Sequence, residues 1–328
     1  MIRAIEYRRF GGPEVLEEVD RPEQAPDDGE VRIAVRAVGL NPIDFKIFEG
    51  DLQPVERVQR LIHPRRWLEG ASARFPRGVA RDFAGVIDAV GAGVTGLAVG
   101  DAVLGTLRSA PGQADTRGAL TTALVAPAAD VVKKPAPLSF TQAACLGVAS
   151  QTACGAFRQL DLHDGDVIVI SAAAGGVGSI AAQLALSRSA TVIGIAGARN
   201  TDYLRSLGTI PVAYGENLTS RVREAAPAPV TKLLDCYGRG YVTLGRELGL
   251  PGRSIGTLVP SPAAILRGAQ FTGGRHGGRG DLEEVGQLVA DDAIKVEIAH
   301  TYSLTVEQVR AAYTELAKGH VRGKLAVD

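Results

Sequence analysis

The chain has 328 residues, more than one ordinary hydrophobic core supports, and we therefore expect two compact domains. Apolar residues make up 45% and charged residues 22%, which is close to the globular average and excludes a disordered chain. Because 36 basic residues balance 36 acidic ones, no net positive field would draw the protein to nucleic acid or to an anionic membrane. A neutral small-molecule ligand fits this balance better.

The amino terminus, residues 1–7 (MIRAIEY), alternates as a β-strand does and lacks the apolar stretch of a signal peptide. No apolar run of 18 residues occurs anywhere in the chain. We therefore expect a soluble, cytoplasmic protein without a membrane segment.

The three cysteines, Cys145, Cys154 and Cys236, are widely separated and show no CxxC spacing. This pattern favours neither a disulfide framework nor a zinc cluster. We interpret all three as buried, small apolar side chains.

Residues 1–135 consist of short β-rich runs that Gly, Pro and Asp interrupt, for example 31–38, 85–90 and 101–104. Such alternation with turn residues is typical of antiparallel strands. We predict a compact, mostly antiparallel β domain with no long amphipathic helix.

Residues 136–299 alternate between helical and strand patterns, which indicates a parallel sheet covered by helices. We predict a doubly wound α/β domain with helices at 139–160 (Ser139 as N-cap), about 180–187 and 201–207, and strands at 167–170, 191–195 and 232–236.

The remaining segment, 300–328, contains a predicted helix at 304–318 and a strand at 325–327, and we expect it to return to the first domain. The run 273–280 (GGRHGGRG) is predicted to be a mobile loop.

A glycine-rich turn follows the buried strand 167–170 and precedes an Ala-rich helix. Glycines let the backbone approach a pyrophosphate closely, and the helix N-terminus offers free N–H groups to that anion. The candidate cofactor-binding residues are Ala174, Gly175, Gly176, Val177 and Gly178. A tight turn without a ligand is the alternative interpretation.

The type of dinucleotide depends on the end of the next strand, where an NAD site places an acidic residue on the ribose. Residues 197–200 (GARN) contain no carboxylate, and Arg199 could instead form a bidentate contact with a 2′-phosphate. With Asn200 beside it, this segment favours NADPH over NADH. Alternatively, Arg199 is a solvated residue near the start of the next helix.

Several ordered motifs together carry a family resemblance over nearly the whole chain. They are AAAGGVG (172–178), DFAGVI (82–87), GAGVTG (91–96), VGDAV (99–103) and GHVRGKL (319–325). The chain resembles the zeta-crystallin-like quinone oxidoreductases, a zinc-independent branch of the medium-chain dehydrogenase/reductase superfamily. The resemblance implies a GroES-like β-rich domain plus a Rossmann-like domain, an active cleft between them, and a homodimer formed through sheet edges.

Zinc-dependent relatives carry a Cys and a His-Glu pair where this chain has LNPID (40–44) and RDF (81–83). Neither segment supplies the thiolate or imidazole that zinc requires, so we expect no metal. Without a metal Lewis acid, hydride addition to a polarised, conjugated acceptor is easier than alcohol oxidation. The resemblance thus implies NADPH-dependent reduction of a quinone or an α,β-unsaturated carbonyl.

Three candidate catalytic residues follow from the resemblance. Asn41 lies in the family's N-x-x-D segment, with Asp44, and could hydrogen-bond a ribose hydroxyl or the substrate carbonyl. Lys46 stands where several quinone reductases have Tyr, so it is either a proton donor or a solvated side chain. Thr152 matches a Thr near the nicotinamide, or it is an ordinary helix hydroxyl bonded to its own backbone.

Two further cofactor-binding candidates follow in the same way. Tyr214 corresponds to a Tyr near the adenosine phosphate, or it is a half-buried aromatic at a strand end. Lys324 either reaches the cofactor or belongs to a solvated rim with Arg322.

The segment 51–78 is longer than the short loop expected in this family and holds the only Trp. We hypothesise that Trp67 and Phe75 shape an apolar substrate pocket under a lid. A surface decoration or a subunit contact is the alternative.

Two other functions stay open at this point. One is a tailoring enoyl reductase or a redox-neutral enzyme of a biosynthetic pathway. The other is a non-catalytic NADPH-binding protein with a structural or RNA-binding role, against which the absence of a clustered basic stripe argues.

Overall fold

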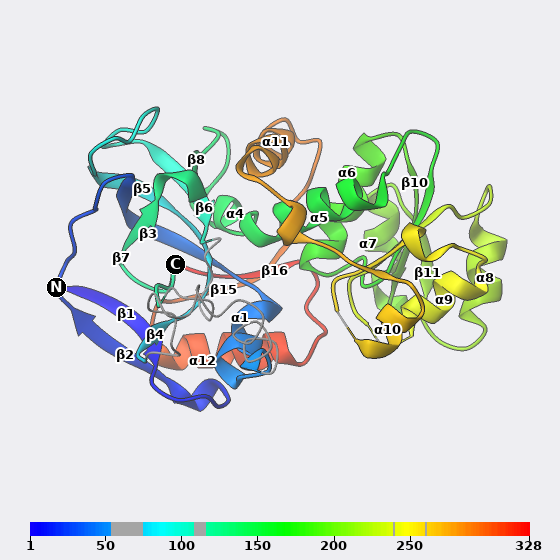
Figure 1. The fold of residues 1–328 in the computed structure, drawn as a ribbon, viewed down its shortest axis with the longest axis horizontal. Coiled ribbons are helices and arrows are strands. Elements are labelled where there is room, and N and C mark those ends of the chain that lie inside the picture. The colour runs from blue at the N-terminus through cyan, green and yellow to red at the C-terminus, as the bar shows by residue number, and fades with distance from the viewer. Residues whose placement is uncertain (54–74, 108–115, 239, 260) are drawn as a thin grey trace. The chain divides into compact units, whose positions relative to one another are not determined.

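The computed structural model describes residues 1–53, 75–107, 116–238, 240–259 and 261–328. The chain divides into two compact units: unit 1 comprises Met1–Gly147 and Ile298–Asp328, and unit 2 comprises Val148–Glu297. The sequence pattern had placed the corresponding changes near residues 135 and 299. Strands dominate unit 1, whereas unit 2 has a parallel sheet with helices (Figure 1), so the predicted fold class is confirmed.

Unit 1 is built on β-sheets whose neighbouring strands are antiparallel except for one pair. Its smaller sheet has the order β2-β1-β4, and its larger sheet has the order β15-β16-β3-β5-β6-β8, with β7 also pairing with β3. Among the strands that the structure describes in unit 1, only β15 and β16 pair in parallel. The strands are β1 Ile2–Tyr7, β2 Leu16–Arg21, β3 Glu30–Leu40, β4 Arg77–Gly78, β5 Asp82–Val90, β6 Ala102–Thr106, β7 Ala123–Pro127, β8 Val131–Lys133, β15 Ile298–Tyr302 and β16 Lys324–Val327.

The register of the larger sheet brings distant residues to one edge. Leu40 of β3 pairs with Leu325, and Gly39 pairs with Asp82. The residues that flank these pairs, Asn41 and Lys324, therefore lie beside Asp82.

Three helices pack on the strands of unit 1: α1 Pro42–Glu49, α4 Phe140–Ala144 and α12 Val306–Ala317. Helix α1 begins with Pro42 after the Asn41 N-cap and ends at Gly50, whose φ of 89° suits glycine. Phe48 of α1 meets Tyr313 of α12 edge to face, with ring centroids 5.1 Å apart. This fully buried aromatic pair anchors α1, and with it Asn41, to the core of unit 1.

Unit 2 contains a parallel six-stranded sheet with the order β11-β10-β9-β12-β13-β14. The order reverses between β9 and β12, which marks the switch point where doubly wound sheets bind ligands. The strands are β9 Val167–Ile170, β10 Thr191–Ala196, β11 Ile210–Ala213, β12 Lys232–Asp235, β13 Ile255–Thr257 and β14 Gln270–Phe271.

The helices of unit 2 include the two that matter most for the site, α6 Gly176–Ser187 and α5 Gly147–Leu160, which starts at the unit boundary. The others are α7 Thr201–Ser206, α8 Leu218–Ala225, α9 Tyr241–Glu247, α10 Pro262–Leu266 and α11 Arg279–Ala290. In the part of the chain that the structure describes, no helix is long and apolar enough to cross a membrane.

Several predicted elements differ from the structure. The predicted helix 139–160 is two helices, because tight turns at Cys145 and Leu146 separate α4 from α5. The Ser139 N-cap is confirmed, since its Oγ accepts a hydrogen bond from Gln142 N.

The run 273–280, predicted as a loop, instead forms the 3-10 turn Gly274–His276 and the first residues of α11. Its glycines pack against α5, where a Cβ placed on Gly155 would lie 2.4 Å from Gly273 O. A Cβ placed on Gly277 would in turn lie 2.5 Å from Gln151 O, so the close approach needs glycine at both positions.

Of the three cysteines, Cys145 and Cys154 are buried as predicted and Cys236 is half-buried. All three are free thiols, and burial raises the pKa of Cys145 and of Cys154 to about 12.

Candidate functional site

The glycine-rich turn of unit 2 connects β9 to α6 with a tight backbone. Ala172 adopts a φ of 48°, and its carbonyl accepts a hydrogen bond from Gly175 N at 2.9 Å. A Cβ placed on Gly178 would lie only 2.2 Å from the same carbonyl oxygen. The turn and the helix can therefore approach each other this closely only because residue 178 is glycine.

The N-terminus of α6 offers backbone donors at the switch point of the sheet. The first hydrogen bond within α6 runs from Ser179 N to Gly175 O at 2.9 Å, so the amides of Gly176, Val177 and Gly178 precede it. Gly176 and Val177 are partly exposed, whereas Ala174 is buried below them. Free amides and the helix dipole together make this end of the 12-residue helix suitable for an anion such as a pyrophosphate.

The neighbouring strand ends bring the other predicted adenosine-side residues to the same edge of the sheet. Tyr214 follows β11, donates its backbone N–H to Ala196 O at 3.0 Å, and is 55% exposed. A Cβ on Gly197 would lie 3.2 Å from the Tyr214 hydroxyl, so that ring covers the end of β10. Arg199 is exposed and Asn200 half-buried in the 3-10 turn that follows.

A buried carboxylate, which the sequence analysis missed, organises the loops at this edge. Asp235 Oδ1 accepts hydrogen bonds from Ser171 Oγ at 2.8 Å and from Gly238 N at 2.8 Å. Its Oδ2 accepts from Thr257 Oγ1 at 3.0 Å. One side chain thus links the ends of β9, β12 and β13. The only signal in the sequence was an acidic residue directly after the apolar run of β12.

Thr152 lies on α5, buried against the Gly273–Gly274 turn. Its Cγ2 would stand 3.2 Å from a Cβ on Gly273, and the φ of 112° at Gly273 favours glycine there. Among the described residues, the Thr152 hydroxyl makes no hydrogen bond, and the bond to its own helix considered from the sequence is therefore not formed.

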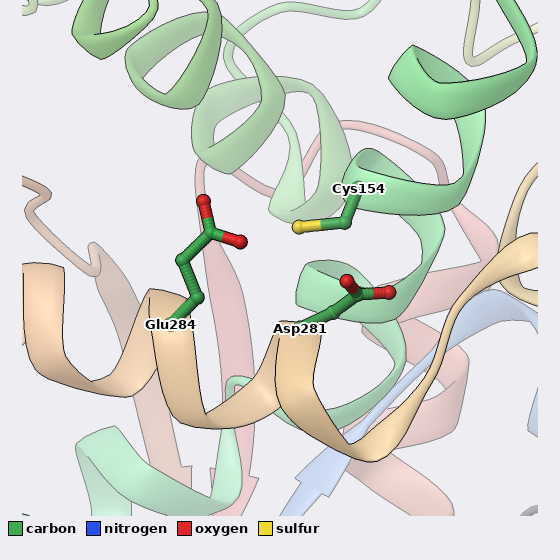
Figure 2. Close-up of side chains that lie close together, drawn as sticks. All are labelled: Cys154, Asp281 and Glu284. Carbon is green, nitrogen blue, oxygen red and sulfur yellow. The ribbon is translucent and has the colours of Figure 1, made fainter.

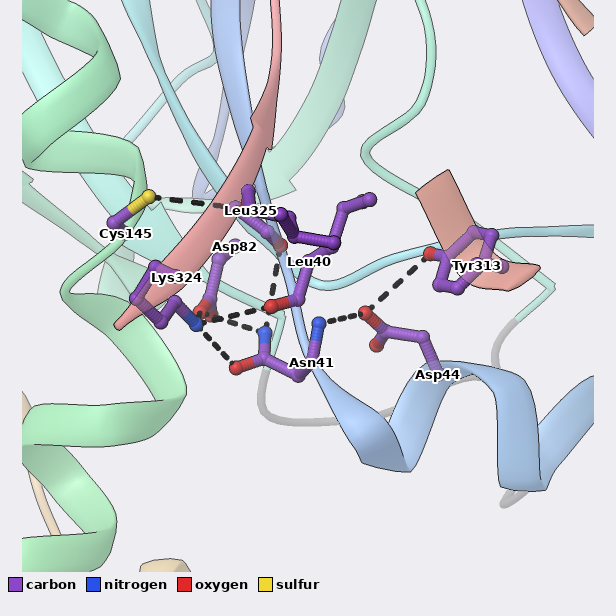
Figure 3. A network of polar contacts seen from close by, with 9 residues as sticks. Leu40, Asn41, Asp44, Asp82, Cys145, Tyr313, Lys324 and Leu325 are labelled. Carbon is purple, nitrogen blue, oxygen red and sulfur yellow. Dashed lines mark hydrogen bonds and ion pairs between the residues drawn. The ribbon is translucent and has the colours of Figure 1, made fainter. Parts of the chain in front are cut away.

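A buried polar network lies at the sheet edge of unit 1 (Figure 3). The Asn41 side chain donates from Nδ2 to Asp82 Oδ2 at 2.9 Å and accepts at Oδ1 from Lys324 Nζ at 2.6 Å. Lys324 also donates to Leu40 O at 3.1 Å. The Asn41 amide is consequently held in one orientation by an anion on its nitrogen side and a cation on its oxygen side.

Lys324 is only 5% exposed, so the alternative of a solvated rim is wrong for this residue. Its Nζ stands 3.9 Å from Asp82 Oδ2, and Asp82 is fully buried. A buried ammonium of this kind needs its carboxylate and carbonyl partners.

The same network is a poor fit for zinc. Asn41 and Asp82 belong to the segments 40–44 and 81–83, where by family resemblance zinc-dependent relatives carry ligands, and neither residue is a thiolate or an imidazole. The Lys324 ammonium already contacts the Asn41 oxygen and lies near the Asp82 carboxylate, so a divalent cation there would meet a fixed positive charge.

Asp44 extends the network towards α12. Its Oδ2 accepts from Asn41 N at 2.8 Å in a capping box and from the Tyr313 hydroxyl at 3.4 Å. Its Oδ1 is buried without a hydrogen-bond partner. Burial, with a further contribution from the nearby Asp82 charge, raises the pKa of Asp44 to about 7.

Two further candidates, Lys46 and Phe75, lie in unit 1. Lys46 is half-buried on α1, and among the described residues its ammonium has no hydrogen bond or ion pair. Phe75 is 36% exposed and packs edge to face on Tyr7 and Phe10, with ring centroids 5.7 and 5.2 Å apart. Trp67 lies outside the described residues.

A second cluster, Cys154, Asp281 and Glu284, has ligand-type atoms within 4.8 Å of one another (Figure 2). Both carboxylates already have guanidinium partners. Arg158 Nη2 bonds Asp281 Oδ1 at 2.6 Å, and Arg188 Nη2 bonds Glu284 Oε1 at 3.0 Å. Two positive charges balance the two negative ones, so the cluster is better explained as an ion-pair group that joins α11 to α5 and α6 than as a cation site.

Comparison with known proteins agrees with this picture. Residues 27–136 match the family described as alcohol dehydrogenase GroES-like domain. Residues 213–327 match the family described as zinc-binding dehydrogenase. A chloroplast envelope quinone oxidoreductase homolog of Arabidopsis thaliana is 35% identical over 347 residues, which covers 100% of this chain and 98% of that protein.

Two solved structures share both the fold and the length of this chain. The quinone oxidoreductase from Coxiella burnetii superimposes with a TM-score of 0.80 at 28% identity, covering 99% of this chain and 98% of that one. The Escherichia coli quinone oxidoreductase complexed with NADPH gives a TM-score of 0.80 at 25% identity, covering 99% of both chains. The chain therefore belongs to the quinone oxidoreductase family of the medium-chain dehydrogenase/reductase superfamily of oxidoreductases.

Proposed function

We propose that this protein is an NADPH-dependent oxidoreductase that transfers a hydride to a quinone or an α,β-unsaturated carbonyl without zinc. The observation that carries the proposal is the edge of the unit 2 sheet, where the α6 amides lie at the switch point. The similarity to the Escherichia coli enzyme, which was solved with NADPH, supports the same assignment.

The proposed preference for NADPH rests on the charges of the residues around the expected adenosine site. The α6 amides of Gly176 to Gly178 would hold the pyrophosphate, and Arg199, Asn200 and Tyr214 would surround the adenosine ribose. Residues 197–200 contain no carboxylate, which a ribose 2′-hydroxyl would need and a 2′-phosphate would repel. We therefore prefer NADPH to NADH.

The chemistry would come from the cofactor, since reduced nicotinamide supplies the hydride when bound. The Lys324 ammonium beside Asn41 and Asp82 supports a reaction without zinc. Within this proposal Asn41 and Thr152 contact the nicotinamide end, and Lys324 fixes the Asn41 amide in addition to any contact with the cofactor. Lys46 is the candidate proton donor, and Trp67 and Phe75 are the candidate pocket residues.

We also infer a homodimer, as the family resemblance favours, and propose a cytoplasmic location. The name of the Arabidopsis relative places that protein at the chloroplast envelope. Fractionation of the source cells, with detection by a specific antibody, tests the location.

The chemical step is tested by isotope transfer. The protein is incubated with NADPH deuterated at C4 of the nicotinamide and with an enone, and the product is analysed by mass spectrometry. The proposal predicts one deuterium on the β-carbon of the product for each NADPH consumed. A product formed without cofactor consumption would identify the redox-neutral alternative, and tight NADPH binding with no turnover of quinones or enones would favour the non-catalytic one.

A further inference from the structure

One cationic side chain in unit 2 has buried nitrogen atoms that have no hydrogen-bond acceptor among the described residues. Arg221 lies on α8, and its Nε and Nη2 are buried without a hydrogen-bond partner. In the part of the chain that the structure describes, it forms no ion pair either. By contrast Arg223, two residues further on the same helix, donates to Glu247 O.

An unpaired, partly desolvated guanidinium is costly, because burial removes water and nothing replaces it. Arg always carries its charge, and its planar fork matches a phosphate or carboxylate with two parallel hydrogen bonds. A site that leaves the nitrogens of such a fork without acceptors therefore suits an anionic ligand.

The position of Arg221 connects it to the adenosine side of the sheet edge. Its Nη2 lies 3.7 Å from the position of a Cβ on Gly215, the residue that follows Tyr214. Gly215 has a φ of 136°, and this conformation, open only to glycine, turns the chain from β11 towards α8. Tyr214 in turn covers Gly197 at the end of β10, two residues before Arg199.

We infer that Arg221 is a specificity-determining residue that binds the 2′-phosphate of the cofactor, together with Arg199. This inference rests on the proposed function for the cofactor itself. It adds a residue on α8, the helix after β11, whereas the acidic residue of an NAD site lies at the end of β10. Two guanidinium groups, one after β10 and one after β11, would then flank the adenosine ribose.

The test uses Arg221→Gln, with Arg223→Gln as the matched control from the same helix. Calorimetric titration measures the Kd of each protein for NADPH, NADH, 2′,5′-ADP and 5′-AMP, and thermal unfolding confirms that the variants are folded. Arg221→Gln should weaken NADPH and 2′,5′-ADP about 10- to 100-fold, the loss expected for charge-assisted hydrogen bonds, and change NADH and 5′-AMP by less than about threefold. Arg223→Gln should leave all four unchanged.

A second variant, Arg221→Lys, keeps the charge but loses the fork, and we expect an intermediate affinity for 2′,5′-ADP. Equal loss of NADPH and NADH in Arg221→Gln, or values equal to those of Arg223→Gln, would overturn the inference. So would a wild-type protein that does not distinguish 2′,5′-ADP from 5′-AMP.

Failure of the proposed function has a different signature. If Arg221→Gln retains the wild-type kcat for quinone reduction with saturating NADH, the proposed hydride transfer is supported independently of the ligand of Arg221. If neither dinucleotide binds to the wild-type protein, the cofactor assignment fails and the role of Arg221 fails with it.

Discussion

Individual buried polar residues carry much of the specificity of unit 1. Asn41, Asp44, Asp82 and Lys324 are at most 5% exposed, yet they exchange hydrogen bonds with one another or with nearby backbone and Tyr313. The sequence indicated Asn41, Asp44 and Lys324 by family motif alone. Their contact could not be derived from spacing, because Asn41 and Lys324 are 283 residues apart and meet only through the register of β3 and β16.

Asp44 should make stability fall as the pH rises. Its folded-state pKa of about 7 lies above the ordinary value of 3.8, so the folded protein binds this proton more tightly than the unfolded chain does. The stabilising proton is fully present below about pH 4 and is lost as the pH rises through about 7. Urea unfolding of wild type and Asp44→Asn at several pH values measures the difference in unfolding free energy.

The expected result is that Asp44→Asn gains stability relative to wild type between pH 5 and pH 8, by on the order of a few kcal/mol. Using the difference between the two proteins cancels the other titrating groups. A difference that stays constant over this range would show that Asp44 titrates as an ordinary surface carboxyl does.

Lys324→Met should destabilise the protein by about 3 kcal/mol, because it removes the cation beside the buried Asp82 and the donor to Asn41. The control is Lys133→Met. Lys133 is 59% exposed in its ion pair with Asp101, and its loss should cost less than about 1 kcal/mol. Chemical denaturation measures the unfolding free energy of both variants. Similar losses of stability would mean that the buried network contributes no more than a surface ion pair.

At the scale of elements, the bounds of helices and strands were predicted most accurately where a single sequence pattern dominated. The buried strands β9 and β10 follow from uninterrupted apolar runs, and their predicted bounds lie within one residue of the structure. Helix α6 begins four residues before its predicted start at Ile180, because its first turn is glycine-rich and has low intrinsic helix propensity. Close packing of Gly178 against the Ala172 carbonyl forms that turn, and helix propensity does not account for this contact.

The short helices α8 to α11 were not predicted, since each has fewer than four turns. Polar or glycine residues also interrupt α8, α9 and α11, and α10 has only five residues. The Asp235 network and the unpaired nitrogens of Arg221 also escaped prediction. Both depend on which loops meet at the end of the sheet rather than on the local sequence.

Gly178→Ala should disrupt the turn between β9 and α6. The new Cβ would lie 2.2 Å from Ala172 O, and the backbone shift that relieves this contact should cost about 1–3 kcal/mol. Gly175→Ala is the matched control, because its Cβ would lie 3.3 Å from the same oxygen and the residue has an ordinary φ of −85°. Thermal unfolding without cofactor compares the two, and equal midpoints would contradict the account of the turn.

At the scale of the whole molecule, the exposed apolar residues near one sheet edge favour self-association. Strand β14 is the last strand in the order of the unit 2 sheet, and next to it in sequence lie Ile265 and Leu266, which are 60% and 88% exposed. The last strand of a sheet with exposed apolar neighbours is a ready site for pairing between chains.

Leu266→Glu should therefore convert a dimer to a monomer. Light scattering during gel filtration should give wild type twice the chain mass of 34.2 kDa and the variant a single chain mass. Val99→Glu, which replaces an apolar residue of unit 1 that is 64% exposed, should leave the dimer intact. A monomeric wild type, or a Leu266→Glu protein that remains dimeric, would contradict dimerisation through the β14 edge.

The most direct test of the central claim is the ratio of kcat/KM for NADPH to that for NADH, measured with a 1,4-quinone after exhaustive dialysis against a zinc chelator. Arg199 and a segment without a carboxylate predict a ratio of about 10 or more, and the Lys324 ammonium beside Asn41 and Asp82 predicts that chelation changes neither value. A ratio at or below 1, or activity that chelation abolishes and zinc restores, would contradict the assignment of a zinc-independent, NADPH-dependent reductase.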